Sequence, residues 1–314
     1  MSYWIEKYKP KNIIDYENED YKNLFYEFKN IKNLLIYGKT GTGKTTFINI
    51  LLNNYLLKGQ DDDDLLILNA SDERGINTVR TKIKTFCKKK INKNQFKIII
   101  LDECDSLTID AQMSMRKIVE DYKNTKFIFI CNYDNKIIQP LISRCVLVHF
   151  KNFSPDYIMR KSLYILKNEN ILNENNKKIY KSYISKLIEY SENDIRRVIN
   201  NLQYLTIMKL KKYDENILNN IYGLISKDLI KKILANLKNM LNIKDTVKLL
   251  SFYNLDNIIN IILDIVVDDK NIEDEKKINF INILSYIDSI KNKNIDYEII
   301  IYKILKEYNE LKFN

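Results

Sequence analysis

The sequence predicts an α/β domain with a parallel sheet, followed by a helical region. Five strand-type runs alternate with helical segments within residues 1–150: Leu34–Tyr37, Leu65–Asn69, Lys97–Leu101, Lys126–Cys131 and Val146–Phe150. Three of these runs are apolar without alternation, which is typical of parallel strands covered on both faces. After Phe150 the strand signals stop, and Leu and Ile recur at three- and four-residue spacing, which indicates helices.

The helical region divides into two blocks. The first begins at Ser154-Pro155-Asp156, where Pro155 occupies a first-turn position, and its pattern continues to about residue 212. The second runs from about Ser226 to the C-terminus. Earlier in the chain, the four carboxylates of Asp61–Asp64 are expected to form a solvated loop without function.

Composition excludes several classes of protein. No apolar run approaches the roughly 18 residues of a membrane span, and the N-terminal residues contain no signal-peptide core. One histidine and four widely spaced cysteines, with no C-x-x-C pair, argue against a zinc site or a disulfide framework. We therefore expect a soluble intracellular protein with reduced thiols.

The first strand run is followed by a phosphate-binding pattern, G-x-x-x-x-G-K-[ST]. Its residues, with the next threonine, are Gly38, Lys39, Thr40, Gly41, Thr42, Gly43, Lys44, Thr45 and Thr46. The glycines allow a tight loop of N–H groups, Lys44 supplies charge for the β- and γ-phosphates, and Thr45 can ligate Mg²⁺. Thr46–Leu52 reads as a helix, whose N-terminus favours an anion. The segment predicts binding of a nucleoside triphosphate with Mg²⁺.

Two later strand ends complete the predicted site. Asp102 and Glu103 follow a buried run, so Asp102 would hold the Mg²⁺ shell and Glu103 would orient and deprotonate the attacking water. An acidic pair in this place can also be a plain helix N-terminus; the phosphate loop upstream favours the functional interpretation. Asn132 ends the next strand, where an amide can position water, although Asn is also common in turns.

The net charge of +10 indicates an anionic partner, although abundant lysine can also follow from an A/T-rich genome. Arg80, Lys84 and Lys88 are four residues apart and form one basic stripe on an expected helix, for which Ser71 and Asp72 offer an N-cap. Such a stripe is often only a solvated face.

These segments together resemble the small subunits of replication factor C, the AAA+ clamp loader. The matching segments are Trp4–Pro10, Tyr37–Thr46, Leu68–Ile76, Ile100–Asp105, Asp110–Gln112, Cys131–Tyr133, Lys136–Ile138, Ser143–Cys145, Asp194–Arg197 and Asn200–Gln203. They cover roughly residues 1–205, and the C-terminal third is similar only in its helical character and position.

The resemblance implies roles for residues that no local pattern assigns. Tyr8 and Pro10 would line the adenine pocket, and Asn132 would sense the γ-phosphate. Arg196 would contact this chain's own nucleotide from a helical lid, while Arg144 would reach in trans into the ATP site of a neighbouring subunit. Without the resemblance, Arg144 reads equally well as part of a structural ion pair.

The resemblance also implies a DNA path. It places Arg74, Arg80, the stripe residue Lys84 and the distant Lys136 against backbone phosphates of primer–template DNA. Such contacts read charge and shape rather than base sequence, so this binding would be independent of sequence.

The expected organisation is an AAA+ P-loop NTPase core at residues 1–150, a helical lid at 151–222 and a helical collar at 223–314. The expected function is ATP-dependent loading of a PCNA-type sliding clamp, together with other large and small loader subunits and at sites of DNA replication. Two alternatives remain open. One is a non-catalytic subunit of the same loader, and the other is a different AAA+ DNA motor such as a branch-migration helicase.

Overall fold

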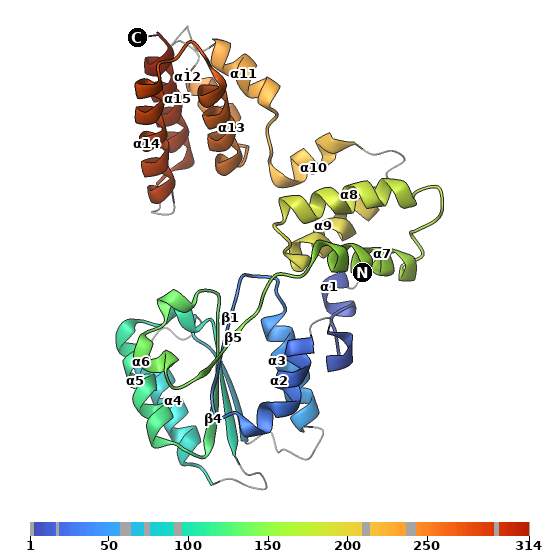
Figure 1. Cartoon of the computed structure of the whole chain (residues 1–314), viewed down its shortest axis with the longest axis vertical. Helices are drawn as coiled ribbons and strands as arrows, with labels where there is room; N and C mark the ends of the chain where they lie inside the picture. The colour runs from blue at the N-terminus through green and yellow to red at the C-terminus, as the bar shows by residue number, and fades with distance from the viewer. Residues whose placement is uncertain are drawn as a thin grey trace. The chain divides into compact units, whose positions relative to one another are not determined.

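The computed structural model describes residues 3–16, 19–56, 64–71, 76–90, 96–208, 214–236, 243–291 and 295–313. The chain divides into two compact units, Met1–Lys211 and Lys212–Asn314 (Figure 1). Within the described ranges, no helix is both long enough and apolar enough to cross a membrane.

The first unit is built on a five-stranded sheet in the order β2-β3-β4-β1-β5. Its strands are β1 (Leu34–Tyr37), β2 (Leu65–Asn69), β3 (Lys97–Asp102), β4 (Thr125–Cys131) and β5 (Val146–His149). Every neighbouring pair is parallel. Each predicted run forms a strand, with ends that agree to within one residue, so the predicted parallel α/β domain is confirmed.

Alternate residues of each strand point to opposite faces of the sheet, and both faces of the central strands β1, β3 and β4 are covered. Leu34 and Ile36 pack with α2 and α3, while Leu35 packs with α4, α5 and α6. These two groups of helices lie on opposite sides of the sheet (Figure 1). These helices are α2 (Glu19–Glu27), α3 (Lys44–Leu56), α4 (Ile76–Lys88), α5 (Ile109–Asp121) and α6 (Gln139–Ile142). Burial on both faces explains why the runs are apolar without alternation.

The strand order places a switch point at β1, which lies between β4 and β5. The chain leaves β1 through α3 on one face, whereas α4, α5 and α6 make the later connections on the other. In open parallel sheets, the crevice at the carboxyl ends of the strands at such a point is where ligands bind. The phosphate loop follows β1 at this point.

The rest of the first unit is helical. It contains α1 (Trp4–Lys7), α7 (Pro155–Asn168), α8 (Lys177–Tyr190) and α9 (Ile195–Ile207), with short 3₁₀ turns η1 (Ile13–Asp15), η2 (Phe28–Asn30), η4 (Cys104–Ser106) and η5 (Asp134–Lys136). We call α7, α8 and α9 the lid helices. As the sequence predicted, α7 begins with Pro155 in its first turn; Ser154 caps the helix by accepting a hydrogen bond from the Tyr157 N–H at 3.2 Å.

In its described residues, the second unit consists of helices joined by turns and loops. Its helices are α10 (Glu215–Tyr222), α11 (Lys227–Ala235), α12 (Ile243–Leu250), α13 (Leu255–Asp268), α14 (Asp274–Ile290) and α15 (Tyr297–Phe313). The apolar faces of α11 to α15 form one core, in which Ile262, Val266 and Leu305 are fully buried. The predicted domain boundaries at residues 150 and 222 stay predictions.

The prediction of a solvated acidic loop was wrong for Asp64. This residue is 1% exposed, and its charge opposes the fall that burial causes in the pKa of Lys97. The local run of four carboxylates predicted solvation, but it could not show that the last of them precedes a strand beside a buried lysine. The other three carboxylates lie outside the described residues.

Candidate nucleotide-binding site

The phosphate loop joins the end of β1 to the start of α3 at Lys44. Gly38, Gly41 and Gly43 all have positive φ angles, of 150°, 72° and 89°. A Cβ on Gly38 would lie 2.2 Å from the carbonyl oxygen of Phe150, so a side chain cannot fit there. The glycine pattern therefore has a steric cause, and it places the loop against the first turn of α3.

Lys44 turns its ammonium group back into the loop. It donates hydrogen bonds to the carbonyl of Gly38, to that of Lys39 at 2.8 Å and to Oδ1 of Asn132 at 3.0 Å. Burial lowers the pKa of Lys44, and the nearby Asp102 carboxylate opposes that change. The ammonium is thus held beside the loop by oxygen acceptors that phosphate oxygens can replace.

Thr45 and Asp102 form the pair expected for Mg²⁺. The Thr45 hydroxyl lies 3.4 Å from Oδ2 of Asp102, whose Oδ1 accepts a hydrogen bond from the Glu103 N–H at 2.9 Å. Burial raises the pKa of Asp102, and the Glu103 carboxylate adds to this rise. A cation between these oxygens would instead lower the pKa of Asp102. The described residues include no cluster of three or more His, Cys, Asp or Glu side chains placed for a metal.

Glu103 has a strained backbone at the end of the same strand. Its φ angle is 54°, in the left-handed region that side chains other than glycine rarely adopt, and its side chain is exposed. Such strain, of about 1–3 kcal/mol, concentrates at functional sites. Asn132, directly after β4, lines one cavity with Asp102 and Glu103. Its N–H donates to Oδ2 of Asp105 at 3.2 Å.

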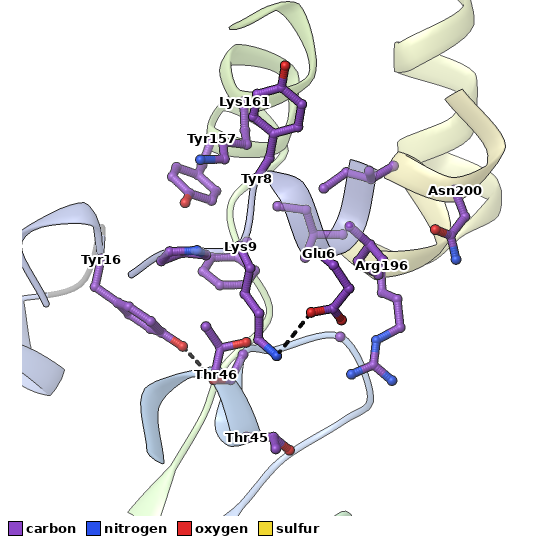
Figure 2. Close-up of a pocket in the computed structure, with 17 residues that line it drawn as sticks. Glu6, Tyr8, Lys9, Tyr16, Thr45, Thr46, Tyr157, Lys161, Arg196 and Asn200 are labelled. Carbon is purple, nitrogen blue, oxygen red and sulfur yellow. Dashed lines mark hydrogen bonds and ion pairs between the residues drawn. The ribbon is translucent and has the colours of Figure 1, made fainter. Parts of the chain in front are cut away.

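Two adjoining cavities make up the site. The smaller, of about 130 Å³, contains the loop, Asp102, Glu103 and Asn132. The larger, of about 450 Å³, is lined by Ile5, Glu6, Tyr8, Lys9, Pro10, Tyr16, Gly41, Gly43, Thr45, Thr46, Phe153, Tyr157, Lys161, Ile195, Arg196, Ile199 and Asn200 (Figure 2). They share Arg196 and four residues of the loop and of the first turn of α3: Gly41, Gly43, Thr45 and Thr46. Together they have the size of a nucleotide site; the phosphate loop borders both cavities, and the aromatic residues line the larger one.

Tyr8 and Pro10, which were predicted to line the adenine pocket, both line the larger cavity. The Tyr8 hydroxyl donates to Oε1 of Glu169 at 2.6 Å, and the same oxygen accepts from the Lys7 ammonium at 2.6 Å. These hydrogen bonds lower the pKa of Glu169. Because Glu169 follows α7, the segment that carries Tyr8 is tied to the lid helices.

Tyr16 belongs to the site, although no sequence pattern indicated it. Its ring packs edge-on against Phe47. Its hydroxyl donates to the carbonyl of Gly43, as Figure 2 shows. Burial raises the pKa of Tyr16, so this hydroxyl stays a donor at neutral pH. Figure 2 also shows the ion pair between Glu6 and Lys9, at 3.7 Å, inside the cavity.

Arg196 lies where the sequence predicted a lid arginine. It lines both cavities from the first turn of α9, and Figure 2 shows its guanidinium near the loop at Thr45. Its charge also contributes to lowering the pKa of Lys44, as expected for two cations that face one space. Asp194 caps this helix by accepting from the N–H groups of Arg196 and Arg197.

Arg144 lies at the opposite edge of the sheet. Its carbonyl accepts from Nδ2 of Asn33, just before β1, at 3.0 Å, whereas the phosphate loop follows β1. A strand of this length spans about 13 Å, so Arg144 is remote from this chain's own site. Its guanidinium is bound to Glu120, with Nε to Oε1 at 2.6 Å. The sequence alone predicted a structural ion pair for Arg144 as readily as a role in trans. The structure shows such an ion pair, and the role in trans stays a prediction.

The predicted DNA contacts are placed only in part. Arg80 and Lys88 on α4 are exposed and Lys84 is half-buried, consistent with one stripe along the helix. Lys136 is exposed on η5, with its ammonium 5.1 Å from the ring centre of Tyr133. Arg74 and the proposed cap at Asp72 lie outside the described residues.

The fold and the site define a P-loop ATPase of the AAA class. Residues 34–152 match the family described as "ATPase family associated with various cellular activities (AAA)". The fold is also similar to that of the RuvB Holliday junction branch migration motor of Thermotoga maritima, with a TM-score of 0.51 and 14% identity over 74% of this chain and 80% of that one.

Curated relatives define the family more closely. Replication factor C subunit 2 of Oryza sativa is 34% identical over 87% of this chain and 84% of its own. Replication factor C small subunit 2 of Pyrobaculum islandicum is 36% identical over 74% of this chain and 72% of its own. The chain belongs to the replication factor C small-subunit family.

Proposed function

We propose that this chain is an ATP-hydrolysing subunit of a clamp loader, which loads a PCNA-type sliding clamp onto primer–template DNA together with other loader subunits. The observation that supports this most is the convergence of five predicted site elements on adjoining cavities: the phosphate loop, the Thr45–Asp102 pair, Glu103, Asn132 and Arg196. Membership of the replication factor C small-subunit family supports the proposed assembly with other loader subunits.

Each residue has a task that follows from its chemistry. Lys44 would exchange its oxygen partners for phosphate oxygens, and Arg196 would bind the same polyphosphate from the lid helices. Thr45 and Asp102 would hold Mg²⁺, which when bound neutralises charge on the β- and γ-phosphates. Glu103 would take the proton of the attacking water, with Asn132 orienting that water.

Arg144 would complete the site of a neighbouring subunit. To do so it must leave Glu120, and exchange of one carboxylate for a developing phosphoryl charge is chemically reasonable for a guanidinium. Arginine fingers supplied in trans accelerate hydrolysis by about 10³–10⁵. Because Arg144 is remote from this chain's own site, the chain should be a weak ATPase alone and an active one in the assembly.

The cations of α4, with Lys136, would meet DNA phosphates.

The test is reconstitution with the remaining loader subunits, the clamp, primed DNA and ATP, with loading followed by retention of clamp on circular DNA. Loading should require ATP and fail with Lys44→Ala in this chain. Arg144→Ala should preserve ATP binding by its own chain while slowing hydrolysis at the adjacent site in mixed assemblies. Full loading by assemblies whose small subunits all carry Arg144→Ala would contradict the trans role.

The alternative of a non-catalytic subunit predicts that Glu103→Gln leaves ATP turnover of the assembly unchanged. The alternative of another DNA motor receives support only from the fold shared with the branch-migration motor. A strand-displacement or branch-migration assay with this chain alone would distinguish it, because a loader subunit should give no unwinding.

A further inference from the structure

The turn between α8 and α9, residues 191–194, rests against the phosphate loop. The Thr40 hydroxyl donates to Oδ2 of Asp194 at 3.1 Å, and Lys39 pairs with Glu192 at 3.2 Å. A Cβ on Gly41 would come within 2.0 Å of Oδ1 of Asp194. The Asp194 carboxylate is therefore in direct contact with the backbone of the loop.

The same carboxylate also forms the cap of α9. Its Oδ1 accepts hydrogen bonds from the N–H of Arg196 at 2.9 Å and from that of Arg197 at 3.2 Å. A cap of this kind fixes the first turn of a helix, and Arg196 projects from that turn into both cavities. One oxygen of Asp194 thus holds the helix that carries Arg196, while the other holds the loop.

The backbone of this turn is unusual. Glu192 and Asn193 are consecutive residues with left-handed φ angles of 51° and 64°. Neither is a glycine, and such conformations persist only where surrounding contacts enforce them. The Glu192 carbonyl accepts from Nδ2 of Asn152 at 3.1 Å, and the Asn193 N–H donates to the carbonyl of Ile188 at 3.1 Å. The turn is held in one shape that presents Asp194 to the loop.

We propose that Asp194 is a positioning residue that sets Arg196 against the bound polyphosphate by fastening α9 to Thr40 of the phosphate loop. The proposal rests on the proposed nucleotide site. The Lys39–Glu192 pair contributes little, because both side chains are mostly exposed, at 66% and 79%. The Thr40–Asp194 hydrogen bond is the contact that connects the two parts.

A double-mutant cycle between Thr40→Val and Arg196→Ala tests the coupling. Valine keeps the shape of threonine but cannot donate, so Thr40→Val should raise the Kd of a fluorescent ATP analogue with Mg²⁺ about fivefold for the full chain. If Thr40 acts through Arg196, the double variant should bind as Arg196→Ala alone does. If the Thr40 hydroxyl instead contacts phosphate directly, the two effects will multiply, and the proposal is wrong.

Two substitutions at Asp194 separate the loop contact from the helix cap. The hydroxyl introduced by Asp194→Ser can still cap α9 but is too short to reach Thr40, so this variant should match Thr40→Val. Asp194→Asn keeps both the cap and a hydrogen bond to Thr40, and should bind within about twofold of wild type. Equal loss in both variants would mean that charge, not positioning, is what matters, and would overturn the proposal.

The matched control is Ser226→Ala, which removes an equivalent helix cap from α11, where Ser226 accepts from the Leu229 N–H at 3.3 Å. It should lower thermal stability without changing the Kd for the ATP analogue. Failure of wild type to bind the analogue would refute the nucleotide site itself. Binding by wild type with multiplicative effects in the cycle would refute only the role of Asp194.

Discussion

The two edges of the sheet use buried lysines in opposite ways. At the carboxyl edge, Lys44 is 8% exposed and borders a cavity. At the amino edge, Lys126 is 7% exposed and donates to the carbonyls of Phe28 at 3.0 Å, Lys29 at 2.7 Å and Ile31 at 2.5 Å. Both ammonium groups have three oxygen partners, yet only one of them faces a space that a ligand can enter.

The difference lies in what surrounds each cation. Lys126 lies over the rings of Phe28 and Phe96, at 5.0 and 4.3 Å from their centres. Its hydrogen bonds satisfy carbonyls of η2 and of the residue after it. Lys97 does the same for α4 by donating to the carbonyls of Phe86 and Lys89. The comparison teaches that a buried lysine indicates function only when its partners can be exchanged for a ligand.

Glu103→Gln should give the largest effect at the carboxyl edge. The amide cannot accept the proton of the attacking water, so turnover by the assembled complex should fall by about 10²–10⁴. ATP binding should persist, because Lys44 and Thr45 are untouched. The measurements are phosphate release and binding of the ATP analogue; hydrolysis at a rate near that of wild type would show that Glu103 is not the base.

Lys44→Met should remove nucleotide binding while leaving the fold intact. Loss of the cation for the β- and γ-phosphates should raise the Kd of the ATP analogue about 100-fold. The melting temperature without nucleotide should change little, because the partners of Lys44 lie beside an open cavity that water can enter. A large drop in melting temperature would instead place Lys44 with the structural lysines.

Lys126→Met should give the reverse result. Three carbonyls lose their donor in a buried place, so the free energy of unfolding should fall by about 2 kcal/mol. Affinity for the ATP analogue should stay within about twofold of wild type below the melting transition. Urea unfolding followed by circular dichroism measures the free energy of unfolding. An unchanged value would mean that the hydrogen bonds of the ammonium only balance the cost of burying its charge.

The smallest effect concerns pH. Burial lowers the pKa of Lys126 to about 8, from its ordinary value of 10.5. Between these values the unfolded chain binds more protons than the folded one, so this group adds stability as pH rises through that window. The stability gap between wild type and Lys126→Met should therefore widen by about 1 kcal/mol from about pH 7.5 to about pH 9. A gap that narrows would show that the hydrogen bonds to the carbonyls raise the pKa of Lys126 above its ordinary value.

The sequence predicted the strands and the phosphate loop because their signals are local. A run buried on both faces must be apolar, and a loop that wraps phosphate must have glycines where side chains would clash, as at Gly38. Asp102, Glu103 and Asn132 could be predicted as site residues for the same reason, since each lies at a strand end or directly after one.

The partners of these residues could not be predicted, because they lie far away in the chain. Glu120 is separated by 24 residues from Arg144, Glu169 by 161 from Tyr8, and Asp194 by 154 from Thr40. No periodicity or spacing reports such contacts. Charge patterning was weaker still: the stripe on α4 is consistent with DNA binding, but a solvated helix face has the same pattern.

The left-handed backbone of Glu103 has a consequence for how this protein can change. Asparagine and glycine adopt that conformation more readily than glutamate does, so Glu103→Asn or Glu103→Gly should make the isolated chain more resistant to heat. Both would also delete the proposed base. Selection for thermal stability alone would therefore favour an inactive variant with asparagine or glycine here. Glutamate would be retained only where ATP turnover itself is under selection.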